Sequence, residues 1–344
     1  MKIEKLRIKN FKSLVDLEII EPNPFSVFVG ANGVGKSNIF EALEFFYYVN
    51  SVYPDAPGNP KVSQKITFQM FDGVNLLSFR EQNRQASIEL HVEVGSIHSS
   101  IYSTGSTEND LFYIVSDGTF SDRSFSENAK NGAANKLFKN FSRIFIGQSR
   151  LERINAQVRS NERLTITASN LEKVLKRLLF DENRREDMID YLRLLIPEFE
   201  RLEIHSDNIG GTDTLLIYEK GSDKPFNRSL ISDGTYNILC LLTALYQSDE
   251  PQFLCIEEPE NGLNPFVVKE LVNLFRNACE EKGHYIWLNT HSQTLVEALT
   301  PDEIILVDKV NGETQVKQIK GMDLHGIPTD EAWFSGALGG GTPW

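Results

Sequence analysis

The sequence predicts an α/β protein with a parallel core sheet and a separate antiparallel part. From residue 221 onward, helical segments alternate with short apolar strands, which is typical of a parallel sheet whose strands are joined by crossover helices. Near the N-terminus, the apolar run at residues 25–29 leads through a glycine-rich loop into a helical segment. Between residues 65 and 121, alternating apolar and polar residues with turn-forming glycines and aspartates indicate antiparallel strands.

Residues 1–150 are expected to form the N-terminal part of the main lobe together with the antiparallel strands. The alternation is strict at residues 86–94, and residues 111–115 are the expected partner strand. A turn at residues 10–13 separates the first two strands. The predicted elements are strands at residues 3–8, 14–20, 25–29, 86–94 and 111–115, and a helix at residues 38–48.

Residues 151–200 change to helical patterns and are expected to form a short helical insertion. Ser169 and Glu172 have the spacing of a capping box, which predicts a helix that begins there and continues through residue 180. A second helix is expected to begin near residue 183 and to end at Pro197, because proline cannot continue a helix. Neither segment sustains the heptads of a coiled-coil arm.

Residues 201–330 are expected to complete the main lobe, and residues 331–344 to form a tail. The predicted elements are strands within residues 202–218 and at residues 253–256, 285–288 and 303–307, with helices at residues 235–247, 265–282 and 294–299. In the tail, Trp333 and Trp344 bracket small residues that cannot form a stable helix. Two interpretations stay open for it, a disordered end or a docking peptide with tryptophan anchors.

Composition excludes some classes of function. The chain has 344 residues with 35 basic and 48 acidic side chains, and its net charge of −13 argues against a surface adapted throughout to nucleic acid. The three cysteines lack metal-ligand spacing and suit reduced thiols, so a cytoplasmic location is predicted. The first residues do not form a signal peptide, and no apolar stretch reaches the roughly 18 residues of a membrane span, so no membrane partner is expected.

Residues 30–37 read Gly-Ala-Asn-Gly-Val-Gly-Lys-Ser, a complete phosphate-binding loop in the strand–loop–helix context that this motif requires. Its glycines let backbone N–H groups approach a phosphate, and the helix N-terminus adds the positive end of its dipole. Lys36 can reach the β- and γ-phosphates, and the Ser37 hydroxyl can ligate Mg²⁺. The predicted ligand is ATP or GTP with Mg²⁺, and the predicted nucleotide-binding residues are Asn32, Gly33, Gly35, Lys36 and Ser37.

The apolar strand at residues 253–256 ends in two acids, Glu257 and Glu258. A phosphate-loop enzyme needs one acid at such a strand end to hold the metal and a second acid to polarise the attacking water. We expect Glu257 on the metal side and Glu258 at the water. A solvated acidic loop after a core strand is the alternative, and the phosphate loop elsewhere in the chain disfavours it.

Two further segments carry candidate site residues. His291 follows the apolar strand at residues 285–288, and from there its imidazole can hydrogen-bond a γ-phosphate. Ser232 and Gly234 precede a helix, and the bare backbone of Gly234 can approach a phosphate. Taken alone, His291 suits a capping or packing role and Ser232 a plain helix cap. The spacing of His291 from the acid pair favours the catalytic interpretation.

The ordered set of motifs resembles the ATP-binding-cassette-type (ABC) ATPases of the SMC/RecF class, and most closely the compact OLD-like ATPases of bacterial defence and DNA-processing systems. The motifs are GANGVGKS at residues 30–37, LISDGT at residues 230–235, FLCIEEPENGLNP at residues 253–265 and NTHS at residues 289–292. The resemblance covers nearly the whole chain. It implies an ABC-ATPase-like head with a P-loop parallel core sheet, an antiparallel β subdomain and a short helical insertion.

In that class two heads enclose two ATP molecules, and the signature segment of one subunit completes the site built on the phosphate loop of the other. The resemblance therefore implies a homodimer or higher homo-oligomer, with Ser232 and Gly234 at the γ-phosphate in trans. It implies that residues 261–264 bridge the dimer. It also makes Gln148 a candidate metal ligand, although a glutamine in a loop is more often simply solvated.

Three departures from that class bear on function. Glu257 stands where the broader class has aspartate, and the longer side chain is expected to change metal affinity without abolishing binding. Asp233 stands where transporter-like cassettes have glycine. OLD nucleases carry a further Toprim domain, whereas no acidic cluster that resembles a nuclease metal site follows His291 in this sequence.

Three functions remain open. The first is a slow, Mg²⁺-dependent ATPase that dimerises through ATP and controls a separate effector, a nuclease or toxin encoded nearby, in prokaryotic anti-phage defence. The second is a RecF-like DNA-repair ATPase that clamps duplex DNA, for which the candidate basic patch is Lys173, Lys176, Arg177, Arg184 and Arg185. The acidic net charge argues against it. The third, a transporter cassette, is disfavoured by the RecF-like opening at residues 8–13 and by the signature segment.

Overall fold

The computed structural model describes residues 2–52, 85–92, 95–103, 112–117, 140–147, 161–207 and 212–338. At its centre lies a six-stranded sheet with the strand order β14-β13-β3-β12-β11-β7. Its parallel strands are β3 (Phe25–Val29), β7 (Phe141–Ile144), β11 (Phe253–Glu257), β12 (Tyr285–Thr290) and β13 (Ile304–Val310). The edge strand β14 (Glu313–Gln318) pairs antiparallel with β13. The predicted parallel core sheet is confirmed.

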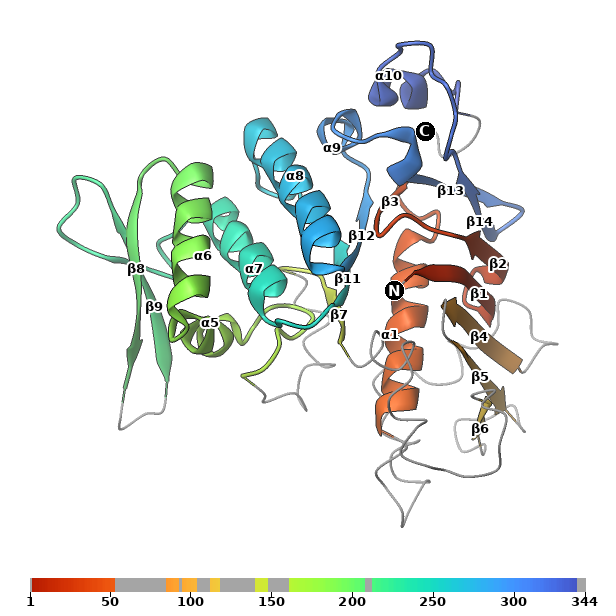
Figure 1. Cartoon of the computed structure of the whole chain (residues 1–344), viewed down its shortest axis with the longest axis horizontal. Coiled ribbons are helices and arrows are strands. Elements are labelled where there is room, and N and C mark those ends of the chain that lie inside the picture. The colour runs from red at the N-terminus through yellow and green to blue at the C-terminus, as the bar shows by residue number, and fades with distance from the viewer. Residues whose placement is uncertain are drawn as a thin grey trace.

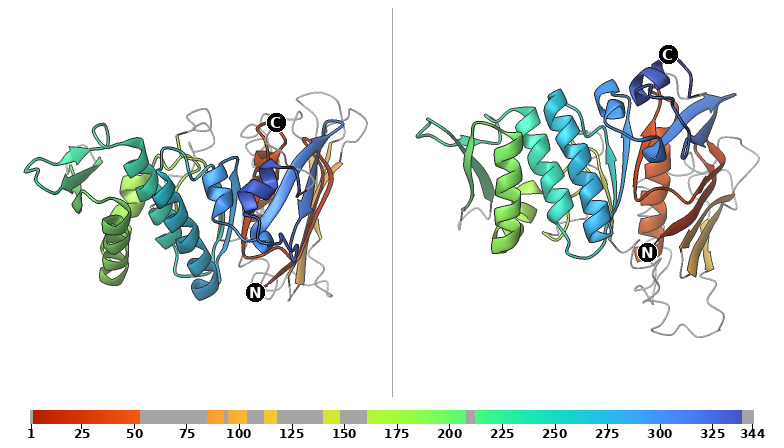
Figure 2. Two further views of the ribbon diagram at one scale, coloured as in Figure 1. Left: turned by 90° about the horizontal axis from the view of Figure 1, so that it is seen from above. Right: turned by 45° about the horizontal axis from the view of Figure 1, so that its top comes forward.

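The two faces of the central sheet pack against different helices, as Figures 1 and 2 show. In β3, Phe25, Val27 and Val29 belong to the hydrophobic cluster that includes α7 (Asp233–Tyr246) and α8 (Pro265–Lys282). Phe28 points the other way, into the cluster around α1 (Lys36–Val52). Because both faces are covered, the core strands are apolar at nearly every position, which is why they read as continuous apolar runs.

A five-stranded antiparallel sheet covers the far side of α1, so that this helix lies between two sheets (Figure 1). Its strand order is β2-β1-β4-β5-β6, with β1 at Ile3–Phe11, β2 at Leu14–Ile20, β4 at Gln85–Val92, β5 at Gly95–Ser103 and β6 at Phe112–Asp117. The antiparallel part is therefore confirmed. The expected direct pairing of residues 86–94 with residues 111–115 is wrong, because β5 lies between β4 and β6.

The helical insertion lies beyond α7, on the side of the molecule away from α1 (Figure 1). It consists of α5 (Leu171–Leu179) and α6 (Glu182–Leu195), and the Asp181 side chain caps the second helix by accepting a hydrogen bond from the backbone N–H of Arg184. A three-stranded sheet follows, with β9 (Asp213–Glu219) at its centre and β8 (Phe199–Ser206) and the short β10 (Phe226–Asn227) at its edges. Helix α5 packs against β9, and α6 packs against β8.

The C-terminal segment packs onto the core rather than extending from it. It contains α9 (Gln293–Glu297), a 3-10 turn at Pro301–Glu303 and α10 (Thr329–Phe334), which lies beside α9 in Figure 1. The Trp333 side chain is 0% exposed and belongs to the main hydrophobic cluster, so the expectation of an exposed tryptophan anchor there is wrong. Trp344 lies outside the described residues. No helix in the described part of the chain has the length and apolarity to cross a bilayer.

Candidate nucleotide-binding site

The carboxyl ends of three adjacent core strands bring the predicted motifs to one edge of the sheet. In the parallel register, Thr290 of β12 lies opposite Val29 of β3, and Asn289 lies opposite Glu257 of β11. The phosphate loop follows Val29 directly. Such an edge of a parallel sheet is where open α/β proteins bind ligands, because the loops that leave neighbouring strands meet there.

The phosphate loop is held from behind by the β13–β14 hairpin. A Cβ atom added at Gly30 would lie 2.2 Å from the backbone oxygen of Val307, and one added at Gly35 would lie 2.0 Å from the Thr314 hydroxyl oxygen. Gly35 also has a φ of +106°, which favours glycine. The Thr314 hydroxyl donates to the Val34 carbonyl over 2.8 Å. Sequence analysis missed Thr314, because nothing near it in the chain marks it as a neighbour of the loop.

The Lys36 ammonium group lies inside the loop. It is buried and donates hydrogen bonds to the carbonyl oxygens of Gly30 at 2.6 Å and Ala31 at 2.8 Å. Burial lowers the pKa of Lys36, and the nearby carboxylates of residues 257, 258 and 260 oppose that shift. The cation thus lies among carbonyl oxygens and acids, and a lysine in such a loop can pair with the charge of a phosphate.

The two residues expected on the metal side, Ser37 and Glu257, lie in contact. The Ser37 hydroxyl donates to Oε2 of Glu257, and the Asn289 amide donates to the same oxygen over 3.1 Å. Both candidate ligands are oxygen donors, as Mg²⁺ prefers. Within the described residues no group of three or more His, Cys, Asp and Glu side chains forms a metal site of its own. A metal held by Ser37, Glu257 and substrate phosphates fits this donor set, because Mg²⁺ commonly binds through one or two protein ligands.

Glu258 and His291 form a second group next to Glu257. Nδ1 of His291 lies 3.7 Å from Oε1 of Glu258, and the Asn261 amide donates to Oε2 of Glu258 over 3.0 Å. The Glu258 backbone has a φ of 47°, a left-handed conformation that is strained for a side chain of this kind, and its N–H donates to the Asn289 carbonyl. The backbone turn therefore aims Glu257 and Glu258 in different directions from adjacent positions.

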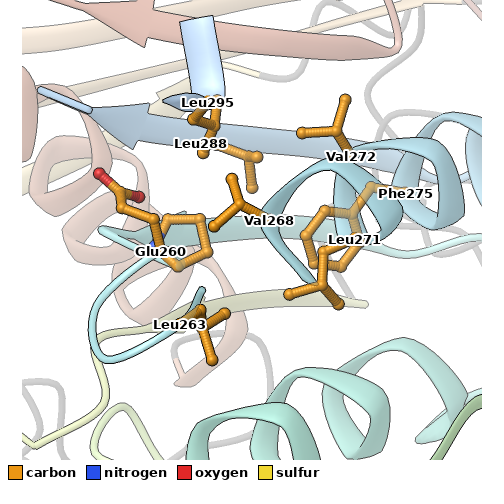
Figure 3. Close-up of a pocket in the computed structure, with 9 residues that line it drawn as sticks. Glu260, Leu263, Val268, Leu271, Val272, Phe275, Leu288 and Leu295 are labelled. Carbon is orange, nitrogen blue, oxygen red and sulfur yellow. The ribbon is translucent and has the colours of Figure 1, made fainter. Parts of the chain in front are cut away.

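Glu260 is a further acid of the site that the sequence analysis did not select. It accepts a hydrogen bond from the Thr290 hydroxyl, which in turn accepts one from the N–H of Ser292. Burial raises the pKa of Glu260. In Figure 3 it lies at the rim of a small apolar hollow lined by Val268 and Leu288, with its carboxylate pointing away from them. The contact links the loop after β11 to the loop after β12.

The signature segment, residues 230–235, packs against the loop after β11, so one side of its backbone is covered. The Ser232 hydroxyl caps α7 by accepting from the N–H of Thr235 over 3.1 Å. A Cβ atom at Gly234 would lie 2.5 Å from the carbonyl oxygen of Gly262, and the Asn237 amide donates to the Asn261 carbonyl over 2.6 Å. The helix-cap interpretation of Ser232 is therefore confirmed, and its role at a nucleotide stays a prediction.

The edge strand β7 and the loop after it hold two residues that bear on the candidate metal site. Gln148, the candidate metal ligand from the loop after β7, lies outside the described residues. Arg143, within β7, was not selected from the sequence, although it is buried beside the site. Its Nε lies 2.6 Å from Oε1 of Glu257, and its Nη1 lies 2.8 Å from Oε2 of Glu44. A lone arginine in an apolar strand was the available signal, because arginine is rarely buried without partners.

Comparison with known proteins places this chain in a family. A family model described as "AAA domain, putative AbiEii toxin, Type IV TA system" (AAA_21) matches residues 25–297, more than three quarters of the chain. An ATP/GTP phosphatase of Helicobacter pylori is 20% identical over 361 residues, covering 95% of this chain and 94% of that protein. The chromosome partition protein Smc of Methanocaldococcus jannaschii is 49% identical over 43 residues, which is 12% of this chain and 4% of that protein.

Solved structures of Smc head domains show the same fold. An Smc head bound to the C-terminal winged-helix domain of ScpA superposes with a TM-score of 0.56 at 14% identity, covering 95% of this chain and all of that one. The Smc head with an extended coiled coil, bound to the C-terminal domain of ScpA from Pyrococcus furiosus, gives 0.54 at 16% identity, covering 92% and 96%. The expected resemblance to the SMC class is confirmed at the level of fold.

Proposed function

The chain belongs to the AAA_21 family of P-loop ATPases, and from this membership we propose that it is a regulatory ATPase that dimerises through ATP and controls a separate effector protein. The full-length match to an ATP/GTP phosphatase supports nucleotide hydrolysis as its reaction. The observation that carries the proposal is the meeting of Lys36, Ser37, Glu257, Glu258 and His291 at the ends of β3, β11 and β12.

Each of these residues has a proposed task. The phosphate loop, with Asn32, Gly33 and Gly35, and the ammonium group of Lys36 bind the triphosphate. Ser37 and Glu257 hold Mg²⁺, which when bound neutralises charge on the β- and γ-phosphates. Glu258 orients and deprotonates the attacking water, and His291, 3.7 Å away, donates a hydrogen bond to the γ-phosphate. ATP is the proposed nucleotide.

The position of the signature segment, residues 230–235, supports the proposed dimerisation. Ser232 is exposed at the N-terminus of α7, where backbone N–H groups and the helix dipole favour an anion. Its hydroxyl contacts the hydroxyl and the N–H of Thr235 in α7, and its exposed side is available to a second copy. We propose that Ser232 and Gly234 of one copy close the site built on Lys36 of the other.

The test is the ATP-dependent mass of the purified chain. We expect wild type to form a dimer with ATP and Mg²⁺ in analytical ultracentrifugation. Ser232→Arg should stay monomeric but folded, with an unfolding temperature lowered by only a few degrees, because it also loses the N-cap of α7, worth about 1 kcal/mol. Ser222→Arg, in the turn before β10, is the matched control and should dimerise like wild type. A Ser232→Arg variant that dimerises with ATP as wild type does would contradict the model.

Effector control is the finer part of the proposal. The family description names a putative toxin system, and the Smc heads of this fold are solved with a bound partner domain. We propose a nuclease or toxin, encoded nearby and active in anti-phage defence, as the partner. Copurification with the neighbouring gene product tests it. Because Trp333 belongs to the core, a tail deletion in this test should begin at residue 339, not at residue 331.

The candidate basic patch gives little support to the RecF-like alternative, because most of its side chains already have partners within the protein. Lys176 donates hydrogen bonds to Asp213 and Ser206, and Arg184 forms an ion pair with Asp249. Arg177 donates to three backbone carbonyls. These side chains hold the helical insertion together, which leaves fewer of them to neutralise phosphates. Binding to duplex DNA in the presence of ATP, falling steeply with salt, would favour the alternative.

A further inference from the structure

Arg143 occupies an unusual position beside the candidate metal site. It lies on β7, the edge strand next to β11, in a register that places it opposite Cys255. Its side chain is 4% exposed, and the two carboxylates that it contacts, Glu44 and Glu257, are 5% and 0% exposed. Burial opposes the charged form of Arg143, but the carboxylates outweigh it and raise its pKa. The three side chains form a buried bridge from β7 to α1 and β11.

The bridge divides the two oxygens of Glu257 between different neighbours. Oε1 accepts from Nε of Arg143 at 2.6 Å and also contacts its Nη2. Oε2 accepts from Ser37 and from Asn289. One oxygen is therefore anchored in the protein, and the other is directed at the hydroxyl that we assign to the metal. A carboxylate held on both sides cannot rotate freely about its terminal torsion.

This anchoring accounts for the glutamate at position 257. Glutamate has one more rotatable bond than the aspartate of the broader class, so its carboxylate needs an additional contact to keep one orientation. Arg143 provides that contact through a planar fork of N–H donors, which suits a carboxylate better than a point charge does. Glu44 holds the guanidinium from the other side, 2.8 Å from Nη1.

We propose that Arg143 is a positioning residue that aims Oε2 of Glu257 at the metal bound by Ser37, with Glu44 fixing the arginine from α1. The inference rests on the proposed nucleotide site and adds to it the group that sets its metal affinity. The competing explanation is a purely structural bridge between β7 and α1. That explanation predicts a loss of stability alone, whereas the positioning role predicts weaker metal binding in a folded protein.

The decisive variant is the full chain with Arg143→Met and Glu44→Gln together. It removes one positive and one negative charge, so the buried net charge is unchanged. Gln keeps the shape of Glu44, and Met keeps an unbranched apolar stem in place of the longer Arg143 side chain. The measurement is a titration of Mn²⁺ by electron paramagnetic resonance, with a non-hydrolysable ATP analogue bound. We expect metal affinity to fall about tenfold or more, as is usual when a group that orients a metal ligand is removed. Metal-free nucleotide affinity should stay within about twofold, because Lys36 and the loop are intact.

Two single variants serve as controls. Glu44→Gln keeps the contact between Arg143 and Glu257 and should keep most of the metal affinity. Arg276→Met breaks another arginine–glutamate contact, in which Nε lies 2.6 Å from Oε1 of Glu303. Arg276 lies over the ring of Phe25, at the end of β3 opposite to the phosphate loop. This variant should lower the unfolding temperature and leave metal affinity unchanged.

A folded double variant that binds Mn²⁺ with wild-type affinity would overturn the inference. If the double variant does not fold, the same titration on Arg143→Lys distinguishes the positioning role from a purely structural bridge. Its ammonium group cannot bridge both carboxylates, so a severalfold loss is expected and an unchanged affinity counts against the positioning role. Failure of wild type to bind Mn²⁺ together with nucleotide would instead refute the proposed function.

Discussion

Acidification should destabilise this protein through one buried histidine, His284. It lies between α8 and β12, is 0% exposed, and its Nδ1 accepts a hydrogen bond of 3.2 Å from the N–H of Gln252. Its Nε2 is buried with no hydrogen-bond partner in the described residues. Protonation of Nδ1 would break that bond and leave a buried charge. Burial, helped by the charge of Lys282, lowers the pKa of His284 from 6.5 to about 4.

The size of the effect follows from this shift. Above pH 6.5 the imidazole is neutral in both states and contributes nothing to the pH dependence. As the pH falls from 6.5 toward 4, the unfolded chain binds the proton and the folded chain does not, so the free energy of unfolding decreases. Each pKa unit corresponds to about 1.4 kcal/mol, which gives about 2 kcal/mol lost at pH 5 and about 3 kcal/mol below pH 4.

The assay is urea denaturation followed by circular dichroism at pH 7.5 and pH 5.0. Carboxylates also titrate in this range, so the informative quantity is the difference between wild type and His284→Asn. The Asn side-chain oxygen can replace Nδ1 as acceptor for Gln252, and it does not titrate. We expect wild type to lose about 2 kcal/mol more than the variant between the two pH values. An equal loss in both proteins would refute the reasoning.

The remaining predictions concern the site and the C-terminal helix. Lys36→Ala should abolish measurable ATP binding in isothermal titration calorimetry, because it removes the cation inside the loop; retained tight affinity would show that the site is elsewhere. Glu258→Gln should bind ATP but hydrolyse it at least ~10²-fold more slowly in a phosphate-release assay, and normal turnover would exclude it as the base. Trp333→Ala should cost about 3–5 kcal/mol in urea denaturation, whereas Phe180→Ala, 82% exposed, should stay within about 0.5 kcal/mol; similar costs for both would contradict the burial of Trp333.

Much of the candidate site could be predicted because its signals are local. The phosphate loop is one continuous segment, and Glu257, Glu258 and His291 each follow directly after an apolar strand. Parallel strands bring their carboxyl ends to one edge of a sheet, so these short segments are placed together by the fold class alone. The roles of the site residues stay predictions that the variants above can test, and the boundaries of the four regions also stay predictions.

Two of the residues that were not selected from the sequence, Arg143 and Thr314, contact partners that lie far away along the chain. Arg143 lies 114 positions from Glu257, and Ser13, whose hydroxyl is 2.6 Å from that of Thr314, lies 301 positions away from its partner. Neither contact leaves a periodic or spaced pattern. Trp333 was misjudged for a related reason, since the small residues after it suggested a free tail, whereas α10 packs beside α9 and the indole is buried in the main hydrophobic cluster.

The sequence by itself determined which side chains could carry the chemistry of the candidate site, because backbone conformation and strand ends depend on residues that are neighbours in the chain. Only the tertiary structure decided how that chemistry is oriented. Which oxygen of Glu257 meets Ser37, and which strand supports the phosphate loop, depend on register and helix packing between distant segments. These choices are made by the burial of side chains from several elements at once, and no single segment contains that information.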